Sequence, residues 1–228
     1  MTSNKATEMS RMRRAIAANM SKSYFTCPTV TLNISADVGG LLAEKKAIST
    51  ESFHPSLTVL LIPLVAKALR KHMELNVSIE ENTIIEKEEI NLGIAVAIPG
   101  GLLVPVVKNA DTKTLPQIYE ELNDLIGKAR SMKLPRQAMT NGTFSITNLG
   151  MYGIESFNPI INLPEAAILG INTITPRVVL ENGVPVSKPY LAFSLTFDHR
   201  AVDGATAAAF LADLKTLIEA CSPQLRTE

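Results

Sequence analysis

The stretch Phe193-Ser-Leu-Thr-Phe-Asp198-His199-Arg200-Ala-Val-Asp203-Gly204 joins an apolar, strand-like run to an alanine-rich helical pattern. It places one of only three histidines in the chain at the end of the predicted strand. Because a histidine side chain has an unperturbed pKa of about 6.5, His199 on a rigid strand end is a candidate general base. A lone histidine is more often a satisfied core residue. Here Asp198, Arg200 and Asp203 surround it and can fix its orientation, which favours a functional interpretation.

Composition and charge narrow the class of protein. The chain has 228 residues, of which 46% are hydrophobic and 19% charged, so a folded core is expected. Lys+Arg and Asp+Glu are both 22, which argues against a general nucleic-acid binder. We find no run of 18 apolar residues and no secretory signal at the start, so the sequence predicts neither a membrane span nor secretion.

The two cysteines do not indicate a disulfide framework or a metal site. Cys27 and Cys221 form no CxxC pair, and no zinc-like Cys/His cluster, GxGxxG motif or P-loop occurs. We interpret both as small buried or interface groups. A reducing compartment fits this usage, and we expect a cytoplasmic location or an organelle matrix.

Periodicity predicts a mixed α/β sheet flanked by helices. Residues 1–9 are polar and expected to be flexible, and residues 10–228 are expected to form one domain because no linker divides them. The predicted helices cover residues 10–24, 37–48, 56–72, 115–132 and 203–220. The predicted strands cover residues 29–34, 77–79, 83–86, 90–98, 102–107, 143–147, 166–174, 177–180 and 190–197.

A second polar stretch runs Asn141-Gly-Thr-Phe-Ser-Ile-Thr147-Asn148-Leu-Gly-Met-Tyr-Gly153. Its alternating hydroxyls share one strand face, and Thr147 stands at the strand end before a glycine-punctuated loop. Such a hydroxyl can donate to a developing oxyanion. The alternative is the ordinary preference of threonine for strands. For Asp203 the alternative to a site role is capping of the last helix.

Together these stretches resemble the catalytic core (E2) of the dihydrolipoamide acyltransferases of 2-oxo acid dehydrogenase complexes, a family that shares the chloramphenicol acetyltransferase fold. Five segments of this chain are similar to that family in order and spacing: Arg11-Met-Arg-Arg-Ala-Ile-Ala17, Asn91-Leu-Gly-Ile-Ala-Val-Ala97 with Gly101-Leu-Leu-Val-Pro105-Val-Val-Lys108, Gly142-Thr-Phe-Ser-Ile-Thr-Asn-Leu-Gly150, Pro164-Glu165-Ala-Ala-Ile-Leu-Gly170, and Phe197-Asp-His-Arg-Ala-Val-Asp-Gly-Ala205.

The resemblance implies acyl transfer between the dihydrolipoyl group of a carrier domain and coenzyme A, without a metal. His199 would be the general base and the Thr147 hydroxyl the oxyanion donor, where many relatives have serine. Asp203, where some relatives have asparagine, would hold the loop around His199. Lys45, Ser56 and Asn148 would contact coenzyme A, although a solvated helix face explains Lys45 equally well.

The resemblance also implies partners. We expect a homotrimer with His199 from one chain and Thr147 from its neighbour, packed further into a cubic or dodecahedral core. A lipoyl domain and the E1 and E3 components would join through domains absent from this sequence, which we expect to be an excised core. Acetyl from pyruvate or acetoin is the expected acyl group. Branched-chain acyl or succinyl transfer, a free small-molecule acetyltransferase and a non-catalytic scaffold stay open as alternatives.

Overall fold

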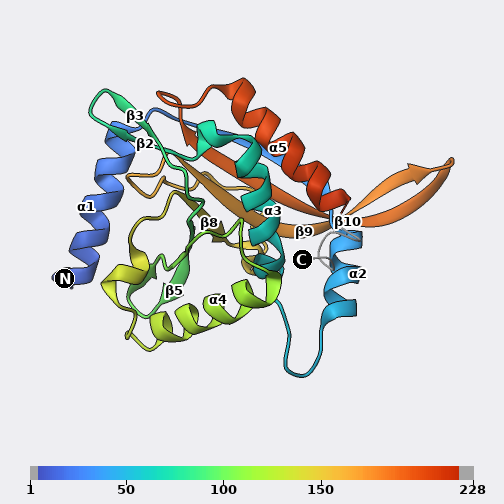
Figure 1. The fold of residues 1–228 in the computed structure, drawn as a ribbon, viewed down its shortest axis with the longest axis horizontal. Coiled ribbons are helices and arrows are strands. Elements are labelled where there is room, and N and C mark those ends of the chain that lie inside the picture. The colour runs from blue at the N-terminus through green and yellow to red at the C-terminus, as the bar shows by residue number, and fades with distance from the viewer. Residues whose placement is uncertain (1–4, 221–228) are drawn as a thin grey trace, which may run out of the picture.

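A six-stranded mixed sheet forms the centre of the chain in the computed structural model, which describes residues 5–220 (Figure 1). The strand order is β1-β10-β9-β8-β4-β7. Strand β8 runs parallel to both neighbours, and the other three pairs are antiparallel. These strands are β1 (Thr29–Asp37), β4 (Leu92–Ile94), β7 (Val106–Val107), β8 (Phe144–Asn148), β9 (Ala167–Glu181) and β10 (Val184–Asp198). The predicted mixed sheet is confirmed.

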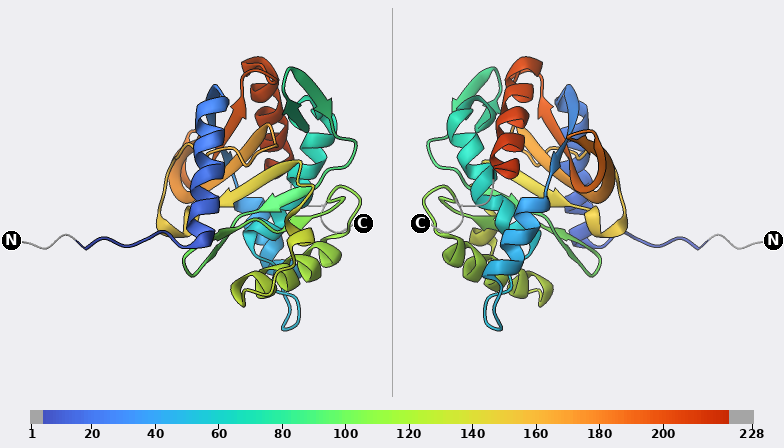
Figure 2. Two further views of the ribbon diagram at one scale, coloured as in Figure 1. Left: turned by 90° about the vertical axis from the view of Figure 1, so that its left-hand side faces the viewer. Right: turned by 90° about the vertical axis from the view of Figure 1, so that its right-hand side faces the viewer.

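Helices cover both faces of this sheet. On one face α3 and α5 lie side by side and α4 packs against α3, while α1 lies apart from them (Figures 1 and 2). The helices are α1 (Arg11–Thr26), α2 (Gly39–Ile48), α3 (Leu57–Lys71), α4 (Leu115–Arg130) and α5 (Gly204–Glu219), with short 3-10 turns η1 (Met73–Leu75), η2 (Arg136–Met139) and η3 (Gly150–Tyr152). Caps fix three of the helix starts: Ser10 accepts from Arg13 N, Ser56 from Val59 N and Thr114 from Gln117 N.

The main hydrophobic core fills the space between the sheet and helices α3, α4 and α5. Phe144 and Ile146 of β8 belong to this core, together with Phe193, Leu195 and Phe197 of β10. Because side chains alternate along a strand, Ser145 and Thr147 point to the opposite face, the side of α1. Strand β8 therefore joins the core on one side and can present hydroxyls on the other.

A long hairpin projects from the body of the protein. Strands β9 and β10 pair along their full length, and Asn182 and Gly183 make the turn with positive φ angles of 51° and 82°. Figure 1 shows the tip of this ribbon reaching well beyond the neighbouring helices. Among the described residues, the portion from residue 176 to residue 188 pairs with no third strand, and Val178 and Leu180 are each 73% exposed.

Three predicted strand boundaries differ from the structure. The runs 90–98 and 102–107 each break in two, because β5 (Val96–Ile98) and β6 (Gly101–Leu103) leave the main sheet as a hairpin of their own. The predicted strands 166–174 and 177–180 are one strand, β9. Pro176 faces Pro189 in the ladder, and the pairing continues on both sides of this rung.

The predicted strand 190–197 begins six residues earlier, at Val184 of β10, and the remaining expectations for the helices and strands hold to within three residues. The hairpin of β2 (Val77–Glu80) and β3 (Thr83–Glu86) forms as predicted. Residues 5–10 lie outside any helix or strand, whereas residues 1–4 and Cys221 fall outside the described residues. Among residues 5–220, no helix has the length and hydropathy needed to cross a lipid bilayer.

Candidate active site

His199 stands on a tight turn directly after strand β10. Its backbone N–H donates to the Pro28 carbonyl at 3.0 Å, which ties the turn to the start of β1. Its ring lies 5.7 Å from the ring of Phe197, a fully buried core residue. The histidine itself is exposed. The local fold therefore presents an accessible imidazole on a backbone fixed at both ends.

Asp198 organises this turn. Its side chain is 3% exposed and accepts from the Arg200 backbone at 3.0 Å and from Arg200 Nη2 at 2.6 Å. Its carbonyl accepts from the backbone N–H groups of Ala201 and Val202. Burial opposes ionisation, but the hydrogen bonds from Arg200 outweigh it and lower the pKa of Asp198. The carboxylate is thus ionised at neutral pH and locks the turn that carries His199.

Asp203 occupies the N-cap position of α5 with extended backbone, but its side chain makes no capping hydrogen bond. The carboxylate is exposed and has no hydrogen bond within residues 5–220. The capping interpretation is therefore wrong for the side chain, although the position is the one expected. Asp198 performs within this chain the positioning expected of Asp203, whose own role stays a prediction.

Thr147 lies at the end of β8, half-buried, on the face opposite the main core. Together with Ser145 it lines a pocket of about 350 Å³. The other walls are mainly apolar: Ile16, Asn19, Met20, Ala95, Leu102, Val104, Phe157, Pro159, Ile160, Asn162 and Ile168. The Thr147 hydroxyl makes no hydrogen bond to any other described residue, so it is available to a ligand in this pocket.

One chain does not bring His199 and Thr147 together. Thr147 is level with Gly170 of β9, and Gly170 is level with Ser194 of β10. His199 therefore lies five residues further along the sheet and two strands across. At about 3.3 Å per residue and about 4.8 Å per strand, the two backbone positions are roughly 19 Å apart. Neither side chain is long enough to close that separation.

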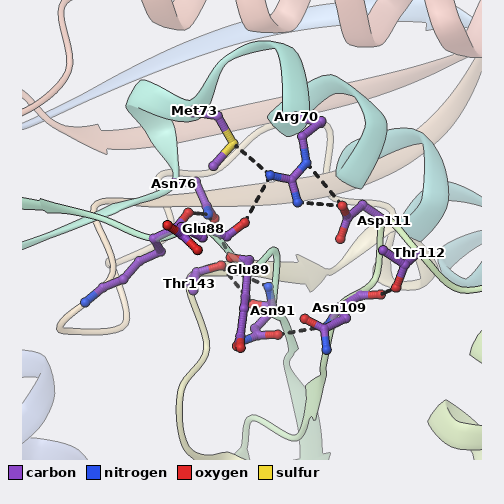
Figure 3. Close-up of polar contacts among 11 residues, drawn as sticks. Arg70, Met73, Asn76, Glu88, Glu89, Asn91, Asn109, Asp111, Thr112 and Thr143 are labelled. Carbon is purple, nitrogen blue, oxygen red and sulfur yellow. Dashed lines mark hydrogen bonds and ion pairs between the residues drawn. The ribbon is translucent and has the colours of Figure 1, made fainter.

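A polar network anchors the start of β8 and its neighbour β4 (Figure 3). The backbone N–H of Asn91 donates to Thr143 Oγ1 at 3.0 Å, and Asn91 Oδ1 accepts from the backbone N–H of Asn109 at 2.8 Å. Asn91 Nδ2 donates to Glu89 Oε2 at 2.9 Å. These bonds fix the start of β8 and therefore the position of Thr147 near its end.

The same network holds the segment before β4 against helix α3. Asn76 Nδ2 donates to the carbonyls of Lys87 and Glu89 at 2.7 and 2.9 Å. Arg70 donates to the Glu88 carbonyl at 3.0 Å and to Asp111 Oδ2 at 2.6 Å, and Figure 3 shows its guanidinium between these two acceptors. The segment has little regular structure of its own, so side chains supply the order.

Two of the three candidate coenzyme A residues lie close together. Asn148 Nδ2 donates to Thr58 Oγ1 in the first turn of α3 at 3.1 Å, and Asn148 Oδ1 accepts from Gly150 N at 2.9 Å. Ser56 is exposed and caps the same helix. Lys45 is half-buried in the last turn of α2, and no hydrogen bond among the described residues joins it to Ser56 or Asn148. All three assignments stay predictions.

Sequence reasoning missed one polar residue near the site, Glu165. It is 4% exposed although it carries a carboxyl group, and Asn162 Nδ2 donates to its Oε1 at 3.0 Å. The signal was available: a glutamate interrupts the apolar run Pro164-Glu165-Ala-Ala-Ile-Leu169. Within residues 5–220, no cluster of three or more His, Cys, Asp or Glu side chains could hold a metal ion.

Comparison with known proteins gives a consistent result. The family model for the 2-oxoacid dehydrogenases acyltransferase (catalytic domain) matches residues 2–225. The dihydrolipoyllysine-residue acetyltransferase component of the pyruvate dehydrogenase complex of Bacillus subtilis is 43% identical over 224 residues, which cover 96% of this chain and 50% of that protein. The chain thus spans about half the length of the curated relatives it matches.

Solved structures agree. An Azotobacter vinelandii dihydrolipoamide acetyltransferase has a TM-score of 0.92 and 33% identity, covering 98% of this chain and 94% of that one. The cubic core of the pyruvate dehydrogenase multienzyme complex has a TM-score of 0.92 and 34% identity over the same shares. A chloramphenicol acetyltransferase shares the fold alone, at 12% identity and a TM-score of 0.56 over 88% of this chain and 94% of that one.

The Azotobacter structure is described by the role of a serine, a histidine and an asparagine in catalysis. In that protein the histidine follows the serine by fifty-two positions and the asparagine follows the histidine by four, which is the spacing of Thr147, His199 and Asp203 here. From the match of its family model over nearly its whole length, this chain belongs to the acyltransferase catalytic-domain family of the 2-oxoacid dehydrogenases.

Proposed function

We propose that this chain transfers an acyl group between coenzyme A and the dihydrolipoyl group of a carrier domain, with acetyl as the natural acyl group. Family membership supports the reaction, and the pyruvate dehydrogenase relatives from Bacillus subtilis and Staphylococcus aureus support acetyl. The single observation that carries the proposal is the pairing of His199 with Thr147. His199 has an exposed imidazole on a turn that Asp198 fixes, and the Thr147 hydroxyl is free in an apolar pocket. The two residues have the same spacing along the chain as catalytic residues in a relative.

The chemistry suits these two groups. A free thiol has a pKa of about 8.5 and is a weak nucleophile at neutral pH. His199 would take the thiol proton as the sulfur attacks the thioester carbonyl, forming the new carbon–sulfur bond. The negative charge then lies on the former carbonyl oxygen, to which the Thr147 hydroxyl would donate. Collapse of this intermediate expels the other thiolate, which recovers the proton from the imidazolium.

The reaction requires a second copy of the chain. With roughly 19 Å between the two backbone positions in one protomer, His199 and Thr147 of the same chain do not reach one thioester. An exposed His199 and a half-buried Thr147 can meet across a boundary between protomers. The match to a cubic core supports self-assembly, for which we propose a homotrimer as the unit.

The remaining assignments form part of the same proposal. Ser56 and Asn148 beside the start of α3, with Lys45 on α2, would contact coenzyme A, while the lipoyl group would approach the Thr147 pocket. Asp203 would hold the surroundings of His199 from within the assembled site. Residues 10–228 would act as the catalytic domain of a cytoplasmic or organelle-matrix complex that also contains E1 and E3 components.

A rate comparison tests the substrate. We expect the purified chain to acylate dihydrolipoamide from acetyl-CoA with a kcat/KM at least tenfold above those for isobutyryl-CoA and succinyl-CoA. Extra apolar groups in a fitted pocket change rates by about ten- to two-hundredfold, and the succinyl carboxylate would lose hydration in the mainly apolar Thr147 pocket. A preference for either larger acyl group would reject acetyl while leaving the reaction type intact.

A variant tests the base. His199→Ala should reduce kcat by about 10²–10⁴, the usual contribution of a positioned general base. The exposed His54, which does not line the Thr147 pocket, gives the matched control His54→Ala. Full activity of His199→Ala, or transfer to small alcohols in preference to dihydrolipoamide, would overturn the proposal.

A further inference from the structure

Glu165 lies between the Thr147 pocket and a second, larger pocket. It lines the second pocket, of about 700 Å³, together with Asn162. Asn162 also lines the Thr147 pocket, as does Ser145, which is two residues before Thr147 on the same strand face. The Glu165 carboxyl group therefore lies behind the wall of the proposed active site rather than in it.

Two glycines make room for this carboxyl group. A Cβ atom added at Gly142 would lie 2.8 Å from Glu165 Oε1, and one added at Gly93 would lie 2.9 Å from Ser145 Oγ and 3.7 Å from Glu165 Oε1. Carbon and oxygen atoms that are not bonded do not normally approach within 3 Å. Strand β4 and the segment before β8 thus each omit a side chain where Glu165 and Ser145 lie.

The surroundings leave the carboxyl group short of donors. Asn162 Nδ2 donates to Oε1, but Glu165 Oε2 and Ser145 Oγ have no hydrogen-bond partner of ordinary geometry among residues 5–220. Burial raises the pKa of Glu165 to about 7, against smaller lowering contributions from Ser145 and Asn162. A protonated carboxyl group gains an O–H that it can donate to the adjacent Ser145 hydroxyl.

We propose that Glu165 works as an uncharged acid behind strand β8, positioning Ser145 and Asn162 in the wall of the Thr147 pocket, and that its ionisation slows acyl transfer. This inference rests on the proposed function, because an ionised Glu165 would repel the negative charge that develops during acyl transfer on the oxygen facing Thr147. Ser145 and Thr147 are about 6.6 Å apart along the strand, so the carboxyl group is within about 10 Å of that oxygen. At an effective dielectric constant of about 20, repulsion over this distance slows the reaction roughly tenfold.

Other charges near Glu165 are too well solvated to replace this effect. The remaining titratable groups that line its pocket are Glu80 on β2, Glu86 on β3, and Lys87, Glu88 and Glu89 in the following segment. Lys87 is half-buried and the four glutamates are exposed, so water and salt screen them. The described residues that line the Thr147 pocket include no titratable side chain.

The test is the ratio of kcat for Glu165→Gln to kcat for the wild type, measured from about pH 6 to pH 9 with acetyl-CoA and dihydrolipoamide. Glutamine keeps the shape and the donor but cannot ionise. We expect the ratio to rise from about one at pH 6 to roughly ten at pH 8.5, because only the wild type acquires the charge. A ratio that stays flat across this range would refute the role of Glu165.

Two further variants sharpen the result. Glu86→Gln removes an exposed carboxylate from the same pocket and should give a flat ratio. Ser145→Ala removes the hydroxyl beside Glu165, so the pH at which kcat falls on the alkaline side should shift; an unmoved fall would contradict the pairing even if Glu165→Gln failed to fold. Absence of turnover by the wild type would refute the proposed function itself, whereas turnover with a flat ratio would refute only this inference.

Discussion

At the scale of single residues, the Thr147 hydroxyl is the group whose contribution separates most cleanly from folding. Thr147→Val keeps the shape and β-branching but removes the donor, so we expect kcat to fall by about 10²–10³. Thr147→Ser keeps the hydroxyl and should stay within about tenfold of the wild type. Steady-state rates of the two variants, with unchanged thermal unfolding, check the assignment. Equal loss in both variants would point to packing rather than to oxyanion stabilisation.

Glu165 should also make stability depend on pH. Its ordinary pKa of 4.5 applies in the unfolded chain, and its pKa in the folded chain is about 7. Between these values the folded protein keeps a proton that the unfolded chain has lost, so the free energy of unfolding falls as pH rises from about 4.5 to about 7 and levels off above. The total loss is about 3 kcal/mol.

Glu165→Gln removes this loss. Urea unfolding at fixed protein concentration should show the variant gaining about 3 kcal/mol relative to the wild type between pH 4.5 and pH 7.5. Glu86→Gln, at an exposed position near the same pocket, should show no such gain. A constant difference between Glu165→Gln and the wild type over that range would mean that the folded pKa of Glu165 is ordinary.

Single residues also show what sequence reasoning can reach. The placement of His199 and Thr147 at strand ends is predictable because the apolar alternation of each strand is visible locally, whereas their catalytic roles stay predictions. The role of Asp198 was partly visible because Arg200 is two positions away. Glu165 was not found as a site residue because its burial depends on Gly93 and Gly142, and nothing local ties either glycine to it.

At the scale of elements, the segment before β4 depends on side chains for its order. Asn76 is fully buried and its amide satisfies two carbonyls of this segment (Figure 3). Asn76→Ala leaves both carbonyls without that donor, so we expect a loss of about 3 kcal/mol in the free energy of unfolding. The exposed turn residue Asn82 supplies the control, since Asn82→Ala should change stability by less than about 0.5 kcal/mol. Chemical denaturation measures the free energy of unfolding of the two variants. Equal values for Asn76→Ala and Asn82→Ala would contradict the importance of the network.

The boundaries of helices and strands agree with the prediction where one hydrophobic periodicity dominates the sequence. They differ from the prediction where tertiary contacts intervene. Helices α3 and α4 begin within one residue of expectation because Ser56 and Thr114 cap them. The apolar run 90–98 carries no sign of its division, since the break at Ala95 depends on its N–H donating to Ile146 of β8. The predicted division of residues 166–180 into two strands is wrong, because Pro176 pairs with Pro189, which lies thirteen residues later in the chain.

At the scale of the whole molecule, a divided active site predicts complementation between inactive variants. His199→Ala and Thr147→Val each lack one group, but a site formed between the two can receive His199 from one chain and Thr147 from the other. Subunits mixed randomly in equal amounts should recover about a quarter of wild-type activity, because one boundary in four then has both groups. Denaturation and joint refolding, compared with each variant refolded alone, measures this. No recovery despite mixed assemblies would mean that both groups act within one protomer.

The projecting β9–β10 ribbon has a consequence for handling this protein. Its outer half carries Val178, Leu180 and Val184 in water, with a free backbone edge on each side among the described residues. Such an edge is a ready template for unwanted strand addition. Newly synthesised monomers that have not yet assembled should therefore be the species that precipitates. Rapid assembly with other subunits should protect the yield of folded protein better than dilution would.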